Sequence, residues 1–433
     1  MHTEAPRYDI DACSFPESCS RIFSFWASGE EGRIIASRDL SNITDSRRRL
    51  REAANDFETC RVWPTATWEG LGPRFLWHMF AYFIGVTSKC EWPADFGSDD
   101  DGEEEGAPQG QWLHELPYWD SKEDRRVDLF LNHTSSIVRL FLSSYSRRAG
   151  FIWSTINLDC IAPVLEFFVK YILRRKICPA NESSLRSSIC VIDCAKKELP
   201  NIAVISKRLP DDLSHGCYVR LGWGTPEHPG LPLATEVPDR ISVNKDARRI
   251  TEDEAQGVED TSFWETSYRN LCARSDCIVL QLTFMPGIVE QSMRRIKRMI
   301  PPTCEFPPLS FQNIGISANA VNSLLSSYVQ LIMEPAPVSW DRGELPVYTL
   351  PTILKPLPRG NQSTDRAHNP FCDDLTLLVE PGTEVLSLLA LGMGLGGTWV
   401  QLIPKEASFG EGRSVWYIHN LSIITPSFWA VDL

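Results

Sequence analysis

The segment Arg74–Val86 (RFLWHMFAYFIGV) constrains the fold most, because it is apolar on almost every side. A helix of this kind must be buried on several sides, and it therefore needs a large core around it. The chain can supply one, since it has 433 residues, of which 43% are hydrophobic. At roughly 100 to 200 residues per domain, this length suggests two or three cooperating units. We expect the segment to form the centre of the N-terminal core.

Further helices are predicted on both sides of this segment. Residues 44–63 place Leu50, Ala53, Ala54 and Phe57 on one face, and either Thr44 or Asp45 can cap the run. Residues 121–148 and 161–176 also carry apolar side chains at helical spacing. The N-terminal half is therefore predicted to be helical.

The second half has a different texture. Short β-branched runs predict strands at SICVID, NIAVIS, CYVRLGW and CIVLQLTF, and further strands at VYTLPTILKPLP, DLTLLVE, TWVQLIP and SVWYIHNLSII. Helices are predicted at 261–274, 287–299 and 317–333. The sequence thus predicts an α+β fold, with a helical N-terminal half and a mixed, strand-richer C-terminal half.

These patterns predict a division of the chain near Pro179. An irregular N-terminal arm over 1–43 leads to a helical region over 44–178, and a mixed region follows over 179–433. The mixed region ends in a β-rich layer over about 341–433. Within the helical region, residues 95–111 (DFGSDDDGEEEGAPQGQ) are acidic and rich in glycine, so they predict a solvated loop.

Composition excludes several classes of function. The formal charge of −13 argues against a protein that mainly coats nucleic acid. The thirteen cysteines follow no zinc or redox spacing, and no signal peptide precedes them, so we expect reduced thiols in an intracellular, cytoplasmic protein. No apolar run is long enough for a membrane span. We expect no metal and no cofactor.

A glycine cluster at Gly392, Gly394, Gly396 and Gly397 resembles a phosphate-binding loop only superficially. Such a loop needs its glycines between a strand and the N-terminus of a helix. Here an apolar, strand-like segment follows the glycines instead. The cluster therefore predicts a turn or a site of close packing.

One compact basic run, Met293–Ile300 (MRRIKRMI), is the candidate contact for phosphate or nucleic acid. On the predicted helix, its four cations would cover a broad face: Arg294, Arg295, Lys297 and Arg298. The alternative is a solvated helix face that pairs with acidic neighbours.

No complete catalytic motif is present, and no residue is singled out as catalytic. We therefore expect a non-enzymatic assembly or scaffold subunit, such as a viral shell (capsid) protein found in the virion. It would make extensive contacts with protein partners or with further copies of itself, because Trp and Arg, which anchor interfaces, are abundant. The alternative is an intracellular, transferase-like enzyme of a divergent family, whose site residues are spread through the sequence.

Overall fold

The chain forms two compact units in a computed structural model. The model describes residues 40, 42–60, 63, 72–88, 123–221, 275–303, 318–340, 348, 350–356, 368–405 and 414–430. The first unit comprises Met1–Ala203 with Pro426–Leu433, and the second comprises Val204–Thr425. The helical N-terminal half and the strand-rich C-terminal half confirm the predicted α+β class. Nearly all of the predicted arm, the acidic segment 95–111 and the helix predicted at 261–274 lie outside the described residues.

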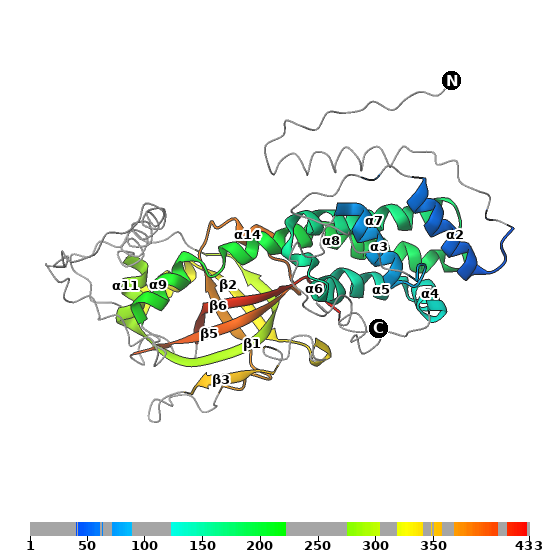
Figure 1. Cartoon of the computed structure of the whole chain (residues 1–433). Coiled ribbons are helices and arrows are strands. Elements are labelled where there is room, and N and C mark those ends of the chain that lie inside the picture. Colours follow the sequence, from blue (N-terminus) through cyan, green and yellow to red (C-terminus); the bar gives the residue numbers. More distant parts are fainter. Residues whose placement is uncertain are drawn as a thin grey trace, which may run out of the picture. The chain divides into compact units, whose positions relative to one another are not determined.

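The first unit is built almost entirely of helices in its described part (Figure 1). Its main helices are α2 (Ser46–Thr59), α3 (Gly72–Phe83), α4 (Glu123–Asn132), α5 (Thr134–Leu140), α7 (Thr155–Arg174) and α8 (Glu182–Arg208). Shorter turns connect them: the π-helix η3 (Phe141–Tyr145), α6 (Ser146–Arg148), and the 3₁₀ turns η4 (Phe151–Trp153) and η5 (Pro179–Asn181). The helices predicted from residues 44 to 176 are confirmed.

Aromatic packing holds these helices together. The indole of Trp77 on α3 is fully buried, and its ring centroid lies 4.6 Å from those of Phe57 and Phe168. Such pairs add roughly 0.5–1.5 kcal/mol beyond the area that they bury. The carboxylate of Asp45 caps α2, accepting a hydrogen bond from the backbone N–H of Arg47 at 3.0 Å. The predicted buried helix is therefore the centre of this core.

The chain returns to the first unit near its C-terminal end. The backbone N–H and the hydroxyl of Ser427 both donate to the carboxylate of Glu198 on α8, at 2.7 and 2.6 Å. The carbonyl of Ala430 accepts hydrogen bonds from the hydroxyls of Ser143 and Ser144 in η3. Residues more than 200 positions apart in the sequence thus complete one unit.

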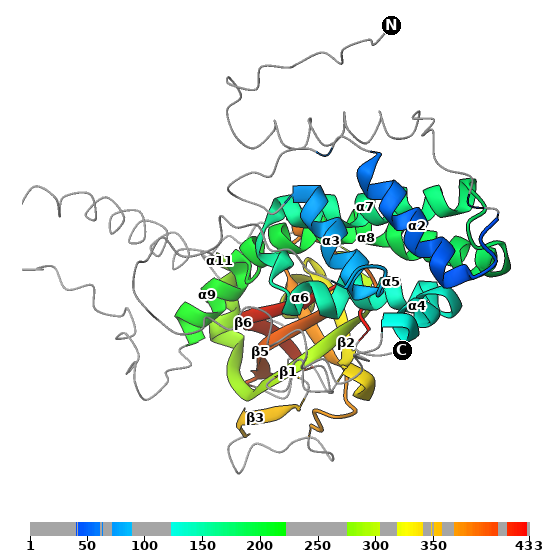
Figure 2. The same ribbon diagram turned by 45° about the vertical axis from the view of Figure 1, so that its right-hand side comes forward.

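The second unit is built on one mixed sheet. Its strands are β1 (Phe284–Ile300), β2 (Val329–Pro335), β3 (Thr352–Lys355), β4 (Leu375–Val379), β5 (Gly394–Pro404) and β6 (Val415–Thr425). Their order is β2-β4-β6-β5-β1-β3, and a further pairing of β1 with β2 closes the sheet on itself. The long strand β1 curves past β5 and β6 (Figure 2). Its N-terminal part pairs with β3 and β5, and its C-terminal part pairs with β2.

Helices cover the apolar side of this sheet. They are α9 (Asp212–Leu221), α11 (Ser275–Thr283) and α12 (Ala318–Ser326), and the short helices η8 (Val338–Trp340) and α14 (Val385–Leu388) lie in the connections. Leu280, Leu324 and Tyr417 belong to one buried cluster that joins α11 and α12 to the sheet. This cluster is the core of the second unit.

Several local predictions were wrong. The runs SICVID and NIAVIS lie within α8, CYVRLGW lies largely in α9, and CIVLQLTF lies largely in α11. Conversely, the segment 287–299 forms β1 rather than a helix, and the helix predicted at 317–333 ends at Ser326, before β2. The β-branched runs were too short to show the helical period of the longer elements around them.

The glycine cluster packs strands closely, as its lack of a following helix predicted. An added Cβ at Gly397 would collide with the backbone carbonyl of Asn420 on β6. At Gly394 it would meet the side chains of Thr425 and Trp340. Gly392 lies in the preceding turn with a φ of 90°. Glycine is therefore needed here for close approach rather than for binding phosphate.

Candidate functional site

The basic run lies on strand β1, so its side chains do not share one face. Alternate residues of a strand point to opposite faces, so Arg294 and Arg295 are separated. A β-bulge between Ile296 and Arg298 shifts the register at the last two cations. Arg294 is fully buried, Arg295 is half-buried, and Lys297 and Arg298 are exposed. The helix predicted here was wrong, and the run does not form a single basic face.

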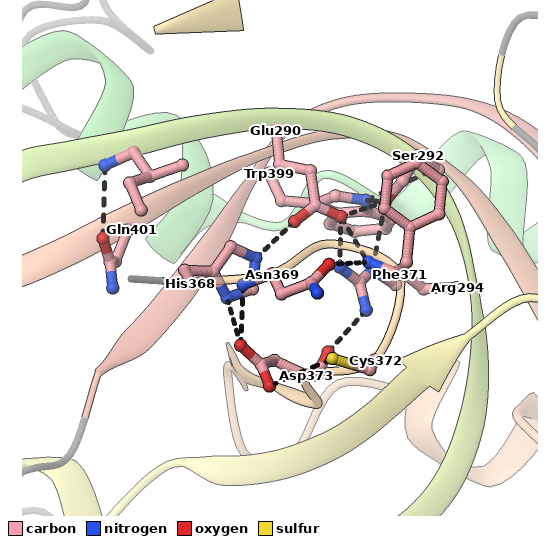
Figure 3. Close-up of polar contacts among 11 residues, drawn as sticks. Glu290, Ser292, Arg294, His368, Asn369, Phe371, Cys372, Asp373, Trp399 and Gln401 are labelled. Atoms are coloured by element: carbon pink, nitrogen blue, oxygen red, sulfur yellow. Dashed lines mark hydrogen bonds and ion pairs between the residues drawn. The ribbon is translucent and has the colours of Figure 1, made fainter. Parts of the chain in front are cut away.

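A buried polar network surrounds Arg294 (Figure 3). Glu290, Ser292 and Arg294 follow one another at intervals of two residues, so they lie on one face of β1. The guanidinium donates to Glu290 through Nε at 2.8 Å and also through Nη2, and the Ser292 hydroxyl donates to the same carboxylate. Trp399 Nε1 donates to the Ser292 hydroxyl at 3.1 Å. We call these four residues, with His368, the β1 network.

The β1 network anchors a loop to the sheet. His368 Nε2 lies 2.7 Å from Glu290 Oε2, and its other ring nitrogen lies 3.8 Å from Asp373 Oδ2. Arg294 Nη1 donates to the backbone carbonyl of Asp373 at 2.8 Å. The imidazole also packs on the indole of Trp416, with ring centroids 5.1 Å apart. Residues 368–373 are thus fixed against β1 by hydrogen bonds and by packing.

The electrostatics of this network favour a structural role. Burial raises the pKa of Glu290. The hydrogen bond from His368, the charge of Arg294 and the other donors together lower it by more, so the net shift is downward. Arg294 has its charge matched within the protein. Arg295 pairs with Glu334, and Lys297 pairs with Asp374 at 2.8 Å. Lys297 and Arg298 are the two exposed cations of the run, so a contact with phosphate or nucleic acid stays a prediction for these side chains.

A second set of cations lines a groove in the first unit. The groove has a volume of about 510 Å³, within the range of roughly 300–1,000 Å³ that is common for binding sites. Its described lining is Phe167, Lys170, Leu173, Arg174 and Arg186. We call it the α7–α8 groove. Three of these side chains are cationic, and no carboxylate is among them.

The helical period explains how the groove forms. On α7 the lining residues fall at positions 167, 170, 173 and 174, which share one face of a helix. Lys196 on α8 bonds Glu166 on α7 at 2.7 Å, whereas Arg186, ten residues earlier on α8, lines the groove beside the C-terminal end of α7. The two helices therefore run antiparallel past each other along the groove.

Carboxylates flank the groove without filling it. Glu166 accepts from both Lys170, at 2.8 Å, and Lys196, at 2.7 Å. Burial raises the pKa of Glu166, but the two lysines lower it by more, so the net shift is downward. Arg186 pairs with Glu182 at 2.7 Å, four residues before it on α8. Glu166 thus accepts from two lysines, and the described lining of the groove contains three cations and no carboxylate.

Comparison with known families gives one match. Residues 123–263, about a third of the chain, match the family described as Argonaute siRNA chaperone (ARC) complex subunit Arb1. This part of the chain is similar to Arb1. No curated protein and no solved structure matches the chain significantly. We call residues 123–263 the Arb1-like region. It contains every described residue of the α7–α8 groove and none of the β1 network.

The match bears on the class of function. A family of complex subunits supports a protein that works by contacting other proteins, as the sequence predicted. It gives no support to a viral shell protein or to a transferase-like enzyme. Among the described residues, no three His, Cys, Asp or Glu side chains are placed to hold a metal ion. No described helix is long and apolar enough to cross a membrane.

Sequence reasoning missed the α7–α8 groove for a specific reason. The basic residues after Leu173 were interpreted only as favourable charges in the last turn of a helix. The second wall was not recognised, because SICVID was predicted to be a strand although it lies in α8, just after Arg186. A helical reading from Leu185 to Ile205 would have placed Arg186 on a helix beside α7.

Proposed function

We propose that this protein is a non-enzymatic subunit of an Argonaute siRNA chaperone complex and that it acts by binding protein partners. The observation that carries the proposal is the match of residues 123–263 to the Arb1 family, whose description names such a subunit. An intracellular location is part of the proposal.

The architecture of the Arb1-like region supports a binding role. Its described part, residues 123–221, is helical; the helices from α4 to α8 bury apolar side chains in the core of the first unit, whereas α9 belongs to the core of the second. Long packed helices give a rigid surface, which reduces the entropy lost when a partner binds. The α7–α8 groove offers a concave place on that surface. A scaffold needs such preformed surfaces rather than a reactive centre.

Co-purification tests the proposal directly. The tagged full-length chain is expressed together with an Argonaute protein from the same organism, with and without a synthetic siRNA duplex, and is purified through its tag. We expect Argonaute to be retained and the two proteins to elute together in size-exclusion chromatography with light scattering. A control protein of similar size and charge is co-expressed in place of Argonaute. If it is also retained, the capture is non-specific.

The opposite result is equally clear. If the chain elutes alone, near its monomer mass of 49.0 kDa, while Argonaute is not retained under any siRNA condition, the proposal is wrong.

A further inference from the structure

We propose that the α7–α8 groove binds an acidic peptide segment of a protein partner, with an apolar side chain of that segment as its anchor. This inference rests on the proposed function, because it supplies the surface through which a complex subunit would hold its partner. The charge of the groove, its apolar wall and its rigidity favour such a ligand.

Charge selects an acidic ligand. Among the described residues, the lining holds Lys170, Arg174 and Arg186 and no carboxylate. The adjoining residues Arg175 and Lys176 are exposed and extend the positive surface beyond the end of α7. The whole chain has a formal charge of −13, so this patch opposes the overall charge of the protein. Acidic groups would therefore be attracted to this place rather than to the surface in general.

The wall of the groove selects an apolar anchor. Leu173 lies between Lys170 and Arg174 on α7, and Phe167 lies about one turn before Lys170. Leu173 is half-buried, so part of its side chain can still be covered by a ligand. A groove that combines an apolar floor with a few placed charges resembles the grooves that receive short peptide segments. Burying an apolar side chain there adds roughly 25 cal/mol for each Å² removed from water.

These features favour a peptide over RNA. A single-stranded RNA site uses exposed aromatic rings on which bases stack. The described groove contains one aromatic ring, that of Phe167, and this side chain is only 4% exposed. It can form a wall, but it cannot present its face to a base. RNA is therefore the competing ligand class that the experiment must distinguish.

The rigidity of the groove makes binding efficient. Glu166 holds Lys170 and Lys196 through hydrogen bonds of 2.8 and 2.7 Å, and Glu182 holds Arg186 at 2.7 Å. Two of the lining cations, Lys170 and Arg186, are thus oriented before a ligand arrives, which lowers the entropic cost of binding.

Fluorescence anisotropy with the full-length protein tests the inference. The probe is a labelled dodecapeptide of Glu and Asp residues around one Phe, and the competitors are a peptide with Lys in place of the acidic residues and a single-stranded RNA. We expect saturable binding of the acidic probe that weakens with added salt. The charge-reversed peptide should not compete.

Paired variants locate the site. R174Q/R186Q removes two cations from the groove, and R48Q/K197Q removes two exposed cations outside its lining. We expect the first pair to weaken probe binding about tenfold, or about 1.4 kcal/mol, and the second to change it less than about twofold. Circular dichroism and thermal unfolding check that both pairs are folded. Equal weakening by both pairs would show a diffuse charge effect and overturn the inference.

A third variant tests the apolar anchor. L173A should weaken the Phe-containing probe about threefold and leave a probe with Ala in place of Phe unchanged, because only the former buries its ring against Leu173. If no saturable binding is seen up to about 1 mM probe, the binding free energy is weaker than about −4 kcal/mol, and the inference is wrong. Tighter RNA binding that R174Q/R186Q abolishes also overturns it, because the groove is then an RNA site.

The two proposals fail separately. If the chain retains Argonaute but the acidic probe does not bind, the groove inference is wrong and the proposed function stands. If the probe binds and R174Q/R186Q weakens it, while Argonaute is not retained, the groove is a peptide site and the proposed function is wrong.

Discussion

The β1 network and the α7–α8 groove use the same residue types with opposite results. In the network, Arg294 and Glu290 are both fully buried, and the carboxylate accepts hydrogen bonds from Arg294 and Ser292 and lies 2.7 Å from the Nε2 atom of His368. In the groove, Arg186 and Glu182 pair at the surface with side chains 68% and 44% exposed. The first arrangement completes a fold, and the second keeps both charged groups at the surface, where a partner can reach the guanidinium.

Burial therefore decides what an arginine does in this protein. A buried pair is costly to break, because the remaining partner keeps an uncompensated charge away from water. An exposed pair contributes little to stability, because water and salt screen it. The free energy of unfolding of variants in the two regions tests this contrast.

Replacing Glu290 with Gln should have the largest effect. The variant keeps the shape of the side chain but leaves the buried guanidinium of Arg294 without its counter-charge. We expect a loss of about 3–5 kcal/mol in the free energy of unfolding, measured by urea denaturation. A loss below about 1 kcal/mol would mean that the network is not a buried ion pair in solution.

The double variant E290Q/R294M sharpens this test. Removing both charges leaves no buried ion unpaired, so the double variant should be more stable than E290Q alone. If the loss of stability in the double variant equals the sum of the losses in E290Q and in R294M measured alone, the Glu290 and Arg294 side chains do not interact as the structure indicates.

Substitution of Gly397 with Ala should have the next largest effect. The new methyl group would meet the backbone carbonyl of Asn420, which cannot move without disturbing the pairing of β5 with β6. We expect a loss of roughly 1–3 kcal/mol, measured by thermal unfolding. Gly382 is the matched control, because a Cβ there meets nothing within 4 Å and carries only the strain of a φ of 78°. G382A should therefore cost less than G397A.

Acid should weaken the second unit through Glu290. Its pKa is lowered in the fold from the ordinary value of 4.5, so its stabilisation is present above that value and is lost as the pH falls through the lowered pKa. Glu166 shifts in the same direction, with only two lysine donors at the surface. Urea denaturation at a series of acidic pH values gives the free energy of unfolding at each pH. We expect this free energy to fall less steeply with acid in E290Q than in E166Q. Equal slopes in the two variants would contradict this ranking.

How much of the fold the sequence predicted depended on the length of each periodic pattern. Helices α2, α3 and α7 were predicted because their apolar positions repeat over several turns. Helix α8 was missed, although Ile192, Ala195, Leu199 and Ile202 are buried at helical spacing. Two β-branched runs within it were interpreted alone, and local propensity outweighed the longer period.

The β1 network could not be predicted because its key spacing is ambiguous. Glu290 and Arg294 are four residues apart, which indicates an ion pair on a helix, while Ser292 between them fits a strand face equally well. The strand is also buried on both faces along much of its length, so it lacks the alternation that marks a half-exposed strand. His368 joins the network from 78 residues away. Only the tertiary fold brings it there.

Replacement of Arg186 with Met should have the smallest effect on stability and so completes the contrast. The variant keeps the length of the stem but breaks the pair with Glu182. Exposed pairs at this spacing contribute about 0.3–0.5 kcal/mol, so we expect a loss of this size in urea denaturation. R48M removes an exposed arginine on α2 that does not line the groove, and its loss of stability should be no larger. A loss above about 1.5 kcal/mol would make Arg186 a structural residue like Arg294, and its place in the groove would then need no partner to explain it.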